Sequence, residues 1–219
     1  MSILIGMPCY GGVVTDKTTI GLFNLGKNFV RNNIDHGILT LSNESLISRG
    51  RSRIANFFIN NTEFEYLFFL DSDVGFDAND IIKLLAHNKE MVCGAYPMKT
   101  IPLKWNFTLS QPKLREGDLV AIDKIGIGFS LIHRDVFTRI AKKYPELKYT
   151  PTNESTTHNP TPAERDNSYH YFHEMRQGDI YLPEDLSFFT RAQTVGMQAW
   201  MDTSINLCHV GSHVFEDQA

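Results

Sequence analysis

Residues 66–73 read Tyr-Leu-Phe-Phe-Leu-Asp-Ser-Asp, and this stretch decides the fold. Five consecutive apolar residues, rich in aromatic side chains, predict a central strand that is buried on both faces. Two carboxylates, Asp71 and Asp73, follow where this strand would end. An unpaired carboxylate is costly to remove from water, so a pair of them at the edge of a core calls for a counter-charge.

The paired acids predict a metal site. Hard divalent cations prefer oxygen ligands, and open α/β sheets bind their ligands at the carboxyl ends of the strands. We therefore expect Asp71 and Asp73 to bind a metal ion in a site that holds a phosphate-bearing substrate. The alternative is a strand-to-turn cap, in which Asp71 and Ser72 form hydrogen bonds with nearby backbone amides.

Length, composition and charge exclude several classes of protein. The chain has 219 residues, of which 42% are hydrophobic, enough for one large α/β domain. The net charge is −4 without a basic block, so we expect no nucleic-acid partner. The longest apolar runs are far shorter than the roughly 20 residues that span a bilayer, so we expect no membrane span. The first eight residues lack a basic region and a cleavage site, and we expect a strand to start there at once.

The three cysteines indicate a reducing compartment. Cys9, Cys93 and Cys208 are odd in number and far apart, which argues against a disulfide framework and against a zinc site. We therefore expect a cytoplasmic protein. Cys93 lies in an apolar run and is predicted to be a small core residue.

The first hundred residues alternate between strands and helices. Apolar runs predict strands at residues 3–7, 37–42, 66–70 and 91–96, and helical spacing predicts helices at 18–31, 46–60 and 77–87. This order predicts a three-layer α/β/α domain with a mostly parallel mixed sheet.

The rhythm changes in the second half. We expect strands at 120–122, 126–133 and 198–201, and helices at 135–143 and from 183 to about 195. Residues 149–167 are rich in Pro, Thr, Asn and His, and they predict a loop over the site. Residues 169–181 are ambiguous and could hold paired strands.

Five motifs, in this order, resemble the GT-A glycosyltransferases. They are the Pro-containing turn at 7–11, the Arg-rich segment at 48–56, the D-x-D at 71–73, the Gly-Ile-Gly-Phe at 126–129 and the acidic pair Glu184-Asp185. The resemblance spans nearly the whole chain and implies one Rossmann-like GT-A domain over 1–219. Residues 1–100 would bind the nucleotide sugar and 101–219 the acceptor. The small size is similar to that of soluble transferases from bacteria and large DNA viruses.

The resemblance implies an activity of the hexosyltransferase type. The donor would be a nucleotide sugar, with UDP favoured by the family alone, and the acceptor a hydroxyl of a glycan or glycoprotein. Asp71 and Asp73 would hold Mn²⁺ or Mg²⁺ against the donor diphosphate, although only one of them need bind the ion directly while the other binds through water or holds the ribose. A histidine near the C-terminus would complete the metal site. Of His209 and His213 we favour His209, although it could be a surface residue. Imidazole suits Mn²⁺ better than Mg²⁺.

The same resemblance implies which residues border the donor. Those after the first strand would border the base and ribose, with Tyr10 either stacking on the base or packed within the loop. Ser72 would face ribose or sugar, or be an ordinary turn hydroxyl. Trp105 would be a sugar-stacking platform for donor or acceptor, or else a core residue. The remaining donor-binding candidates are Pro8, Cys9, Gly11, Tyr96 and Lys99, with Met98 beside them.

Three arginines lie within five residues of a predicted helix. Positions 49 and 53 share a helix face, and position 51 does not. Arginine is suited to bidentate phosphate contacts. We therefore expect Arg49 and Arg53 to contact the nucleotide or diphosphate and Arg51 to lie in solvent. The alternative is a solvated basic helix face.

The acidic pair at the start of the late helix supplies the candidate base. By resemblance, Asp185 would deprotonate the acceptor hydroxyl in an inverting reaction. Glu184 is the alternative base, and one of the two could simply cap the helix. A retaining reaction needs no such base and stays open.

Two other functions compete with a sugar transferase. A HAD-like phosphohydrolase would use Asp71 as its nucleophile, but that family carries its D-x-D on the first strand. A sugar-binding relative without activity is the third possibility, against which the presence of Asp71, Asp73 and Asp185 argues.

Overall fold

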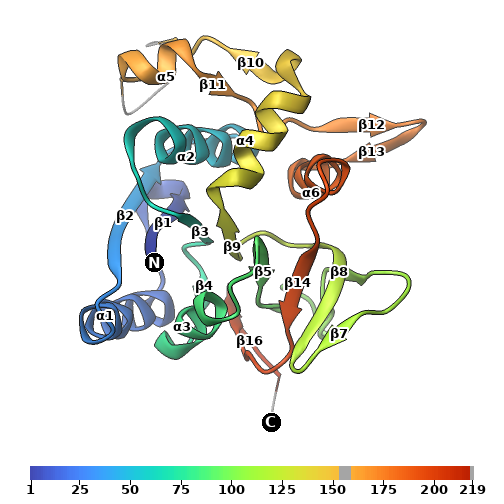
Figure 1. Cartoon of the computed structure of the whole chain (residues 1–219). Coiled ribbons are helices and arrows are strands. Elements are labelled where there is room, and N and C mark those ends of the chain that lie inside the picture. The colour runs from blue at the N-terminus through green and yellow to red at the C-terminus, as the bar shows by residue number, and fades with distance from the viewer. Residues whose placement is uncertain (153–158, 218–219) are drawn as a thin grey trace.

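The central feature of the computed structural model, which describes residues 1–152 and 159–217, is a nine-stranded sheet (Figure 1). Eight strands follow the order β2-β1-β3-β9-β5-β14-β8-β6, and β7 pairs with β8. These strands are β1 (Ser2–Cys9), β2 (Asp35–Ser42), β3 (Tyr66–Leu70), β5 (Met91–Cys93), β6 (Phe107–Leu109), β7 (Arg115–Glu116), β8 (Leu119–Ile125), β9 (Phe129–His133) and β14 (Ala199–Asp202). The strand predicted at 66–70 is confirmed.

The sheet is mixed but mostly parallel, as predicted. β1 lies parallel to both β2 and β3, and β5 lies parallel to β14. β9 is inserted between β3 and β5 and pairs antiparallel with both. Because β8 is likewise antiparallel to its neighbours, β8 and β9 are the two strands that run against the rest of this sheet. The architecture is consistent with a single Rossmann-like domain.

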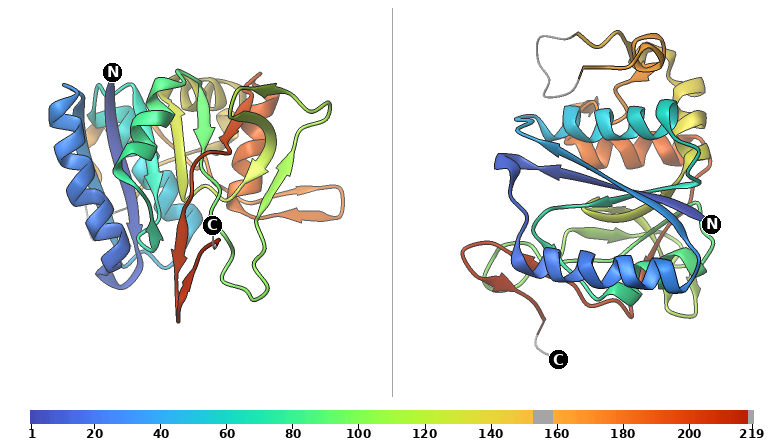
Figure 2. Two further views of the ribbon diagram at one scale, coloured as in Figure 1. Left: turned by 90° about the horizontal axis from the view of Figure 1, so that it is seen from below. Right: turned by 90° about the vertical axis from the view of Figure 1, so that its left-hand side faces the viewer.

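Helices cover both faces of the sheet and give the predicted three layers (Figure 2). α1 (Asp16–Arg31) packs beside α3 (Ala78–Ala86) on one face. The other face carries α2 (Ile47–Asn61), α4 (Arg134–Lys143) and α6 (Glu184–Thr194), which contact one another. Asp77 caps the N-terminus of α3 in a reciprocal capping box. Its side chain accepts a hydrogen bond from a backbone N–H of the first turn, and the side chain of Asp80 accepts one from the backbone N–H of Asp77. Within residues 1–152 and 159–217, every helix is too short or too polar to cross a bilayer.

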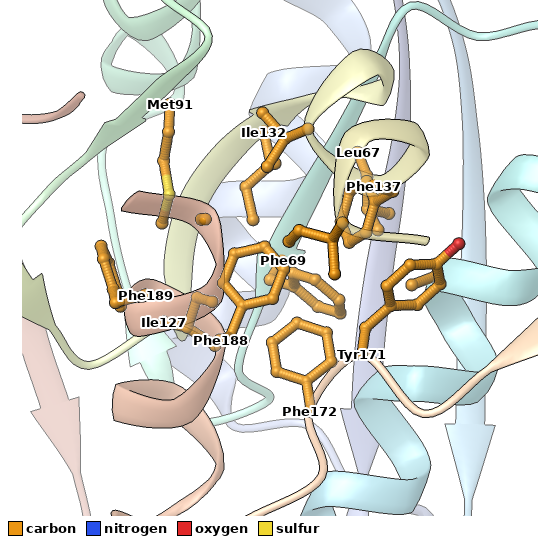
Figure 3. Packing of buried hydrophobic residues seen from close by; sticks show 14 of the residues in the cluster. Leu67, Phe69, Met91, Ile127, Ile132, Phe137, Tyr171, Phe172, Phe188 and Phe189 are labelled. Carbon is orange, nitrogen blue, oxygen red and sulfur yellow. The ribbon is translucent and has the colours of Figure 1, made fainter. Parts of the chain in front are cut away.

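β3 connects the two halves of the core, because its side chains alternate between the faces of the sheet. Leu67 and Phe69 belong to the cluster under α2, α4 and α6, and Phe68 to the cluster under α1 and α3. In the first cluster, Phe172 stacks on Phe188 with the ring centroids 4.6 Å apart (Figure 3). All five residues of β3 are buried, which explains why the strand contains no charged residue.

Small sheets complete the chain. β15 (Cys208–Val210) pairs antiparallel with β4 (Val74–Gly75) and with β16 (Val214–Phe215). The ambiguous stretch at 169–181 holds one strand pair, in which β12 (Met175–Gln177) pairs with β13 (Ile180–Leu182). β10 (Lys148–Tyr149) pairs with β11 (Ser168–Tyr169). The remaining short elements are the 3-10 helices η1 (Tyr10–Gly12) and η2 (Pro145–Leu147) and the helix α5 (Pro162–Asp166).

The loop predicted at 149–167 is therefore wrong in part. Thr161 caps α5 through a capping box with Glu164, and Pro162 occupies the first turn, where a missing N–H does no harm. α5 is one turn long, too short for its periodicity to be visible in the sequence. Residues 153–158 of the predicted loop lie outside the described residues.

Candidate active site

The site begins where β3 ends. The backbone N–H of Asp71 donates to the carbonyl oxygen of Gly128 at 2.8 Å, and the N–H of Thr15 donates to the carbonyl oxygen of Ser72 at 2.9 Å. The second bond ties the loop after β1 to the Asp-Ser-Asp turn. The carboxyl ends of β1 and β3 thus meet at one edge of the sheet, as ligand sites in open α/β folds require.

Asp71 has its counter-charge within the chain. Nη2 of Arg51 lies 2.9 Å from Oδ1 and 3.2 Å from Oδ2 of Asp71. The prediction that Arg51 lies in solvent is wrong, since the residue is only 4% exposed. It shares the buried face of α2 with Ala55 and Phe58, four and seven residues later, and its guanidinium lies 5.6 Å from the ring centroid of Phe69.

Arg51 also reaches the acidic pair of α6. Its Nε lies 3.9 Å from Oε1 of Glu184. Within the described part of the chain, Nε and Nη1 of Arg51 are buried without a hydrogen-bond partner. One guanidinium thus lies between the acid that ends β3 and the acid that starts α6.

Glu184 and Asp185 occupy the first turn of α6, where the helix dipole favours carboxylates. Oδ1 of Asp185 accepts from the backbone N–H of Leu186 at 2.7 Å. Burial raises the pKa of Asp185, and the charge of Asp71 adds to the effect. Burial also raises the pKa of Glu184, with the neighbouring Asp185 as the second cause. Raised pKa values of this kind are typical of carboxylates that accept protons in catalysis.

Asp73 lies between two cationic or potentially cationic groups. Nζ of Lys99 is 2.5 Å from Oδ2 of Asp73, and Nε2 of His209 is 3.4 Å from Oδ1. Burial opposes the ionisation of Asp73, but the hydrogen bonds from His209 and Lys99 outweigh it and lower the pKa of Asp73 to about 2. The pairing of β15 with β4 sets His209 opposite Val74, directly after Asp73.

Gly128 explains why the Gly-Ile-Gly-Phe segment lies beside the acids. A Cβ at this position would lie 2.1 Å from Oδ2 of Asp71 and 2.6 Å from the hydroxyl oxygen of Tyr96. The N–H of Gly128 donates to the Tyr96 hydroxyl at 3.1 Å. Burial, and then the charge of Asp71, raise the pKa of Tyr96, which therefore stays a neutral hydroxyl beside the carboxylate.

A cavity of about 340 Å³ brings together six of the predicted site residues, namely Asp71, Tyr96, Lys99, Glu184, Asp185 and His209. Its polar lining comprises Arg51, Asp71, Tyr96, Lys99, Asn106, Glu184, Asp185 and His209. Asp73 is held against this wall through Lys99 and His209. Asn106 was not predicted, and no motif pointed to it.

Other predicted residues do not line this cavity. Tyr10 is 75% exposed, so it is not a packed loop aromatic, and Gly11 follows it with a φ of +70° that favours glycine. Pro8 and Cys9 close β1, and the charge of Asp71 adds to burial in raising the pKa of Cys9. These residues stay candidates for the donor site. Cys93 is fully buried, as predicted.

The helical arginines do not form a free basic face. Arg49 donates to Glu44 through Nε at 2.8 Å and Nη2 at 2.6 Å. Arg53 is partly buried on α2. Trp105 is 38% exposed, so it is not a core residue, and it lines a neighbouring cavity rather than this one.

Asp73 and His209 fit a manganese or magnesium ion. Nδ1–H of His209 donates to the carbonyl oxygen of Pro97 at 2.9 Å, which turns Nε2 toward Asp73, and such a second contact is typical of metal-binding imidazoles. Asp71 is engaged by Arg51 instead. Among the described residues no three His, Cys, Asp or Glu side chains form a metal cluster. Two protein ligands suffice where substrate phosphates supply the others.

Comparison with known proteins supports the fold. No protein-family model and no curated protein sequence matches the chain. The crystal structure of A197 from STIV is similar over 100% of this chain and 95% of its own, with a TM-score of 0.57 and 17% sequence identity. HddC from Yersinia pseudotuberculosis covers 61% of this chain and 77% of its own, with a TM-score of 0.34 and 8% identity. At this identity, A197 indicates a shared fold and nothing more specific.

Proposed function

We propose that the protein is a metal-dependent glycosyltransferase that moves a sugar from a nucleotide-sugar donor, with UDP favoured, to a hydroxyl of a glycan or glycoprotein acceptor with inversion. One observation carries the proposal: the acid that ends β3 and the acidic pair that starts α6 line the same cavity. Such a site offers a place for a charged leaving group at one end and a proton acceptor at the other. The GT-A resemblance of the motifs supplies the reaction class.

At the donor end, side chains of this chain would bind the metal ion and the diphosphate. Asp73 and His209 would bind Mn²⁺ or Mg²⁺, which as a Lewis acid offsets the charge that develops on the leaving diphosphate. Lys99 lies against Asp73 and can donate hydrogen bonds to a phosphate oxygen. Arg51 neutralises Asp71, so that a diphosphate approaches a less negative wall.

At the acceptor end, Asp185 takes the proton. The acceptor oxygen attacks the anomeric carbon as its hydrogen passes to the Asp185 carboxylate, and the bond from the anomeric carbon to the diphosphate oxygen breaks. A raised pKa makes Asp185 a better proton acceptor than an ordinary aspartate near neutral pH. Its hydrogen bond from Leu186 N–H fixes the orientation of one carboxylate oxygen.

Ligand-induced thermal shifts test the proposal. A nucleotide sugar added with Mn²⁺ should raise the melting temperature, because a ligand that binds the folded state stabilises it. Asp73→Ala should abolish the metal-dependent part of the shift. Asp185→Asn should keep the shift and lose transfer, and Asp179→Asn, at an exposed carboxylate of the β12–β13 hairpin, serves as the matched control. Absence of any shift, together with hydrolysis of p-nitrophenyl phosphate, would instead support the phosphohydrolase.

A further inference from the structure

A second cavity, of about 600 Å³, adjoins the candidate active site. The side chains of Ala95 and Phe107 line both cavities. Two segments connect them along the chain: Cys208 precedes His209, and Trp105 precedes Asn106. A ligand in the larger cavity therefore borders the site where Asp185 lies.

The lining of this cavity combines aromatic rings with hydrogen-bonding groups. Trp105, Phe76 and Phe107 contribute the rings, and Asn206 and Thr203 contribute neutral polar groups. Trp105 is held in place because the loop before it folds back on itself. Trp105 forms an isolated β-bridge with Pro97, and the N–H of Met98 donates to the carbonyl oxygen of Lys104 at 2.7 Å. A partly exposed indole in a cavity that also has polar groups in its lining is typical of a ligand site.

The charge of the lining disfavours a phosphate-bearing ligand. Among the described residues that line it, Asp202, Glu216 and Asp217 oppose one cation, Lys17. Asp202 is already paired with His87, whose Nε2 lies 2.8 Å from Oδ2. Arg51 and Lys99, the cations suited to a diphosphate, line the smaller cavity only. Carboxylates accept hydrogen bonds from hydroxyl groups, so the larger cavity suits an uncharged ligand rich in hydroxyls.

We infer that the larger cavity binds an uncharged oligosaccharide acceptor, which stacks on Trp105 and extends past Ala95 and Phe107 toward Asp185. This inference rests on the proposed function and adds to it the place and the charge class of the acceptor. A volume of about 600 Å³ lies within the range of roughly 300–1,000 Å³ that is usual for small-molecule sites.

Tryptophan fluorescence tests the inference without donor or metal. The chain has two tryptophans, and Trp200 is only 8% exposed against 38% for Trp105. In Trp200→Phe, emission comes from Trp105 alone. We expect a saturable change on titration with at least one neutral tetrasaccharide from a panel of maltotetraose, cellotetraose, mannotetraose and chitotetraose. Should Trp200→Phe fail to fold, the difference between wild type and Trp105→Phe reports the same ring.

Variants and competitors locate the binding. Asn206→Ala should weaken the saccharide roughly three- to tenfold, the scale of losing one or two good contacts. Tyr181→Ala, which removes an exposed ring on β13, should leave the affinity unchanged. The inference is overturned if no saccharide of the panel gives a saturable change, if UDP competes with the saccharide, or if an anionic hyaluronan tetrasaccharide binds more tightly than the neutral ones.

The two proposals can fail separately. A thermal shift with nucleotide sugar and Mn²⁺, but no saccharide binding, would keep the transferase and overturn the acceptor site. Saccharide binding that responds to Asn206→Ala, without any response to a nucleotide sugar, would confirm a saccharide site and contradict the transferase.

Discussion

Replacing Arg51 by methionine removes the one guanidinium that lies between Asp71 and Glu184. Methionine keeps an unbranched side chain of similar length, so the change is chiefly one of charge. Removing one partner of a buried ion pair costs about 3–5 kcal/mol. The Asp71 side chain is 21% exposed and can be partly hydrated, so we expect the lower end of this range, about 3 kcal/mol at neutral pH.

The loss should depend on pH with a definite sign. The pKa values of Glu184 and Asp185 are already raised, and Arg51 opposes the rise of both. Without Arg51 both values rise further, so the folded state takes up protons more readily than the unfolded state. Stability then increases as the pH falls through these raised pKa values, and the deficit of Arg51→Met should shrink on acidification.

Urea denaturation of wild type and Arg51→Met between pH 5 and pH 8 measures both effects. Arg176→Met is the matched control, because the Arg176–Asp179 pair is exposed to solvent and should contribute little to stability. If transfer activity is established, the acidic limb of its pH profile should move to higher pH in Arg51→Met. Equal stability of Arg51→Met and wild type at pH 7.5, or a deficit that does not vary with pH, would refute the assigned role of Arg51.

Three further predictions concern the same site. Gly128→Ala should destabilise the protein by about 1–3 kcal/mol, because the new Cβ would lie 2.1 Å from Oδ2 of Asp71. Gly26→Ala in α1, where a Cβ would have nothing within 4 Å, should be neutral or slightly stabilising. Thermal melts compare the two variants, and equal effects would contradict the reasoning. The stability contributed by the ionised Asp73 should be lost as the pH falls from about 4 to about 2. Over this range the urea midpoint should therefore fall less steeply in Asp73→Asn than in wild type. Parallel curves for the two proteins would speak against the pairing of Asp73 with Lys99 and His209. His209→Ala should weaken Mn²⁺ binding by about tenfold or more, as measured by electron paramagnetic resonance of free Mn²⁺, while His213→Ala should not, and an unchanged affinity in His209→Ala would remove it from the metal site.

The sequence alone determined the layers of the fold. Five apolar residues in β3 require burial on both faces, and the spacing of apolar residues in α3 gives that helix one buried side. These signals are local, since they depend on residues a few positions apart. The same is true of Asp71 and Asp73, whose position at the end of β3 is evident from the run of letters before them.

The sequence did not determine the order of the strands. β9 enters the sheet between β3 and β5, although its residues follow β5 by more than thirty positions. This pairing places Phe129 opposite Leu70 and so sets Gly128 against Asp71. Strand pairing of this kind depends on long-range packing, for which a strand carries no local signal.

Tertiary structure also decided which group neutralises each acid. Helical spacing separated Arg51 from Arg49 and Arg53, but the prediction placed Arg51 on the solvent side of α2. The buried face of α2 contains Ala55 and Phe58 and carries Arg51 into the core. Without Arg51 there, the carboxylate of Asp71 would be a largely buried charge without its partner. His209 reaches Asp73 only because β15 pairs with β4. Sequence fixes where the charges occur along the chain, and only long-range packing decides which of them meet.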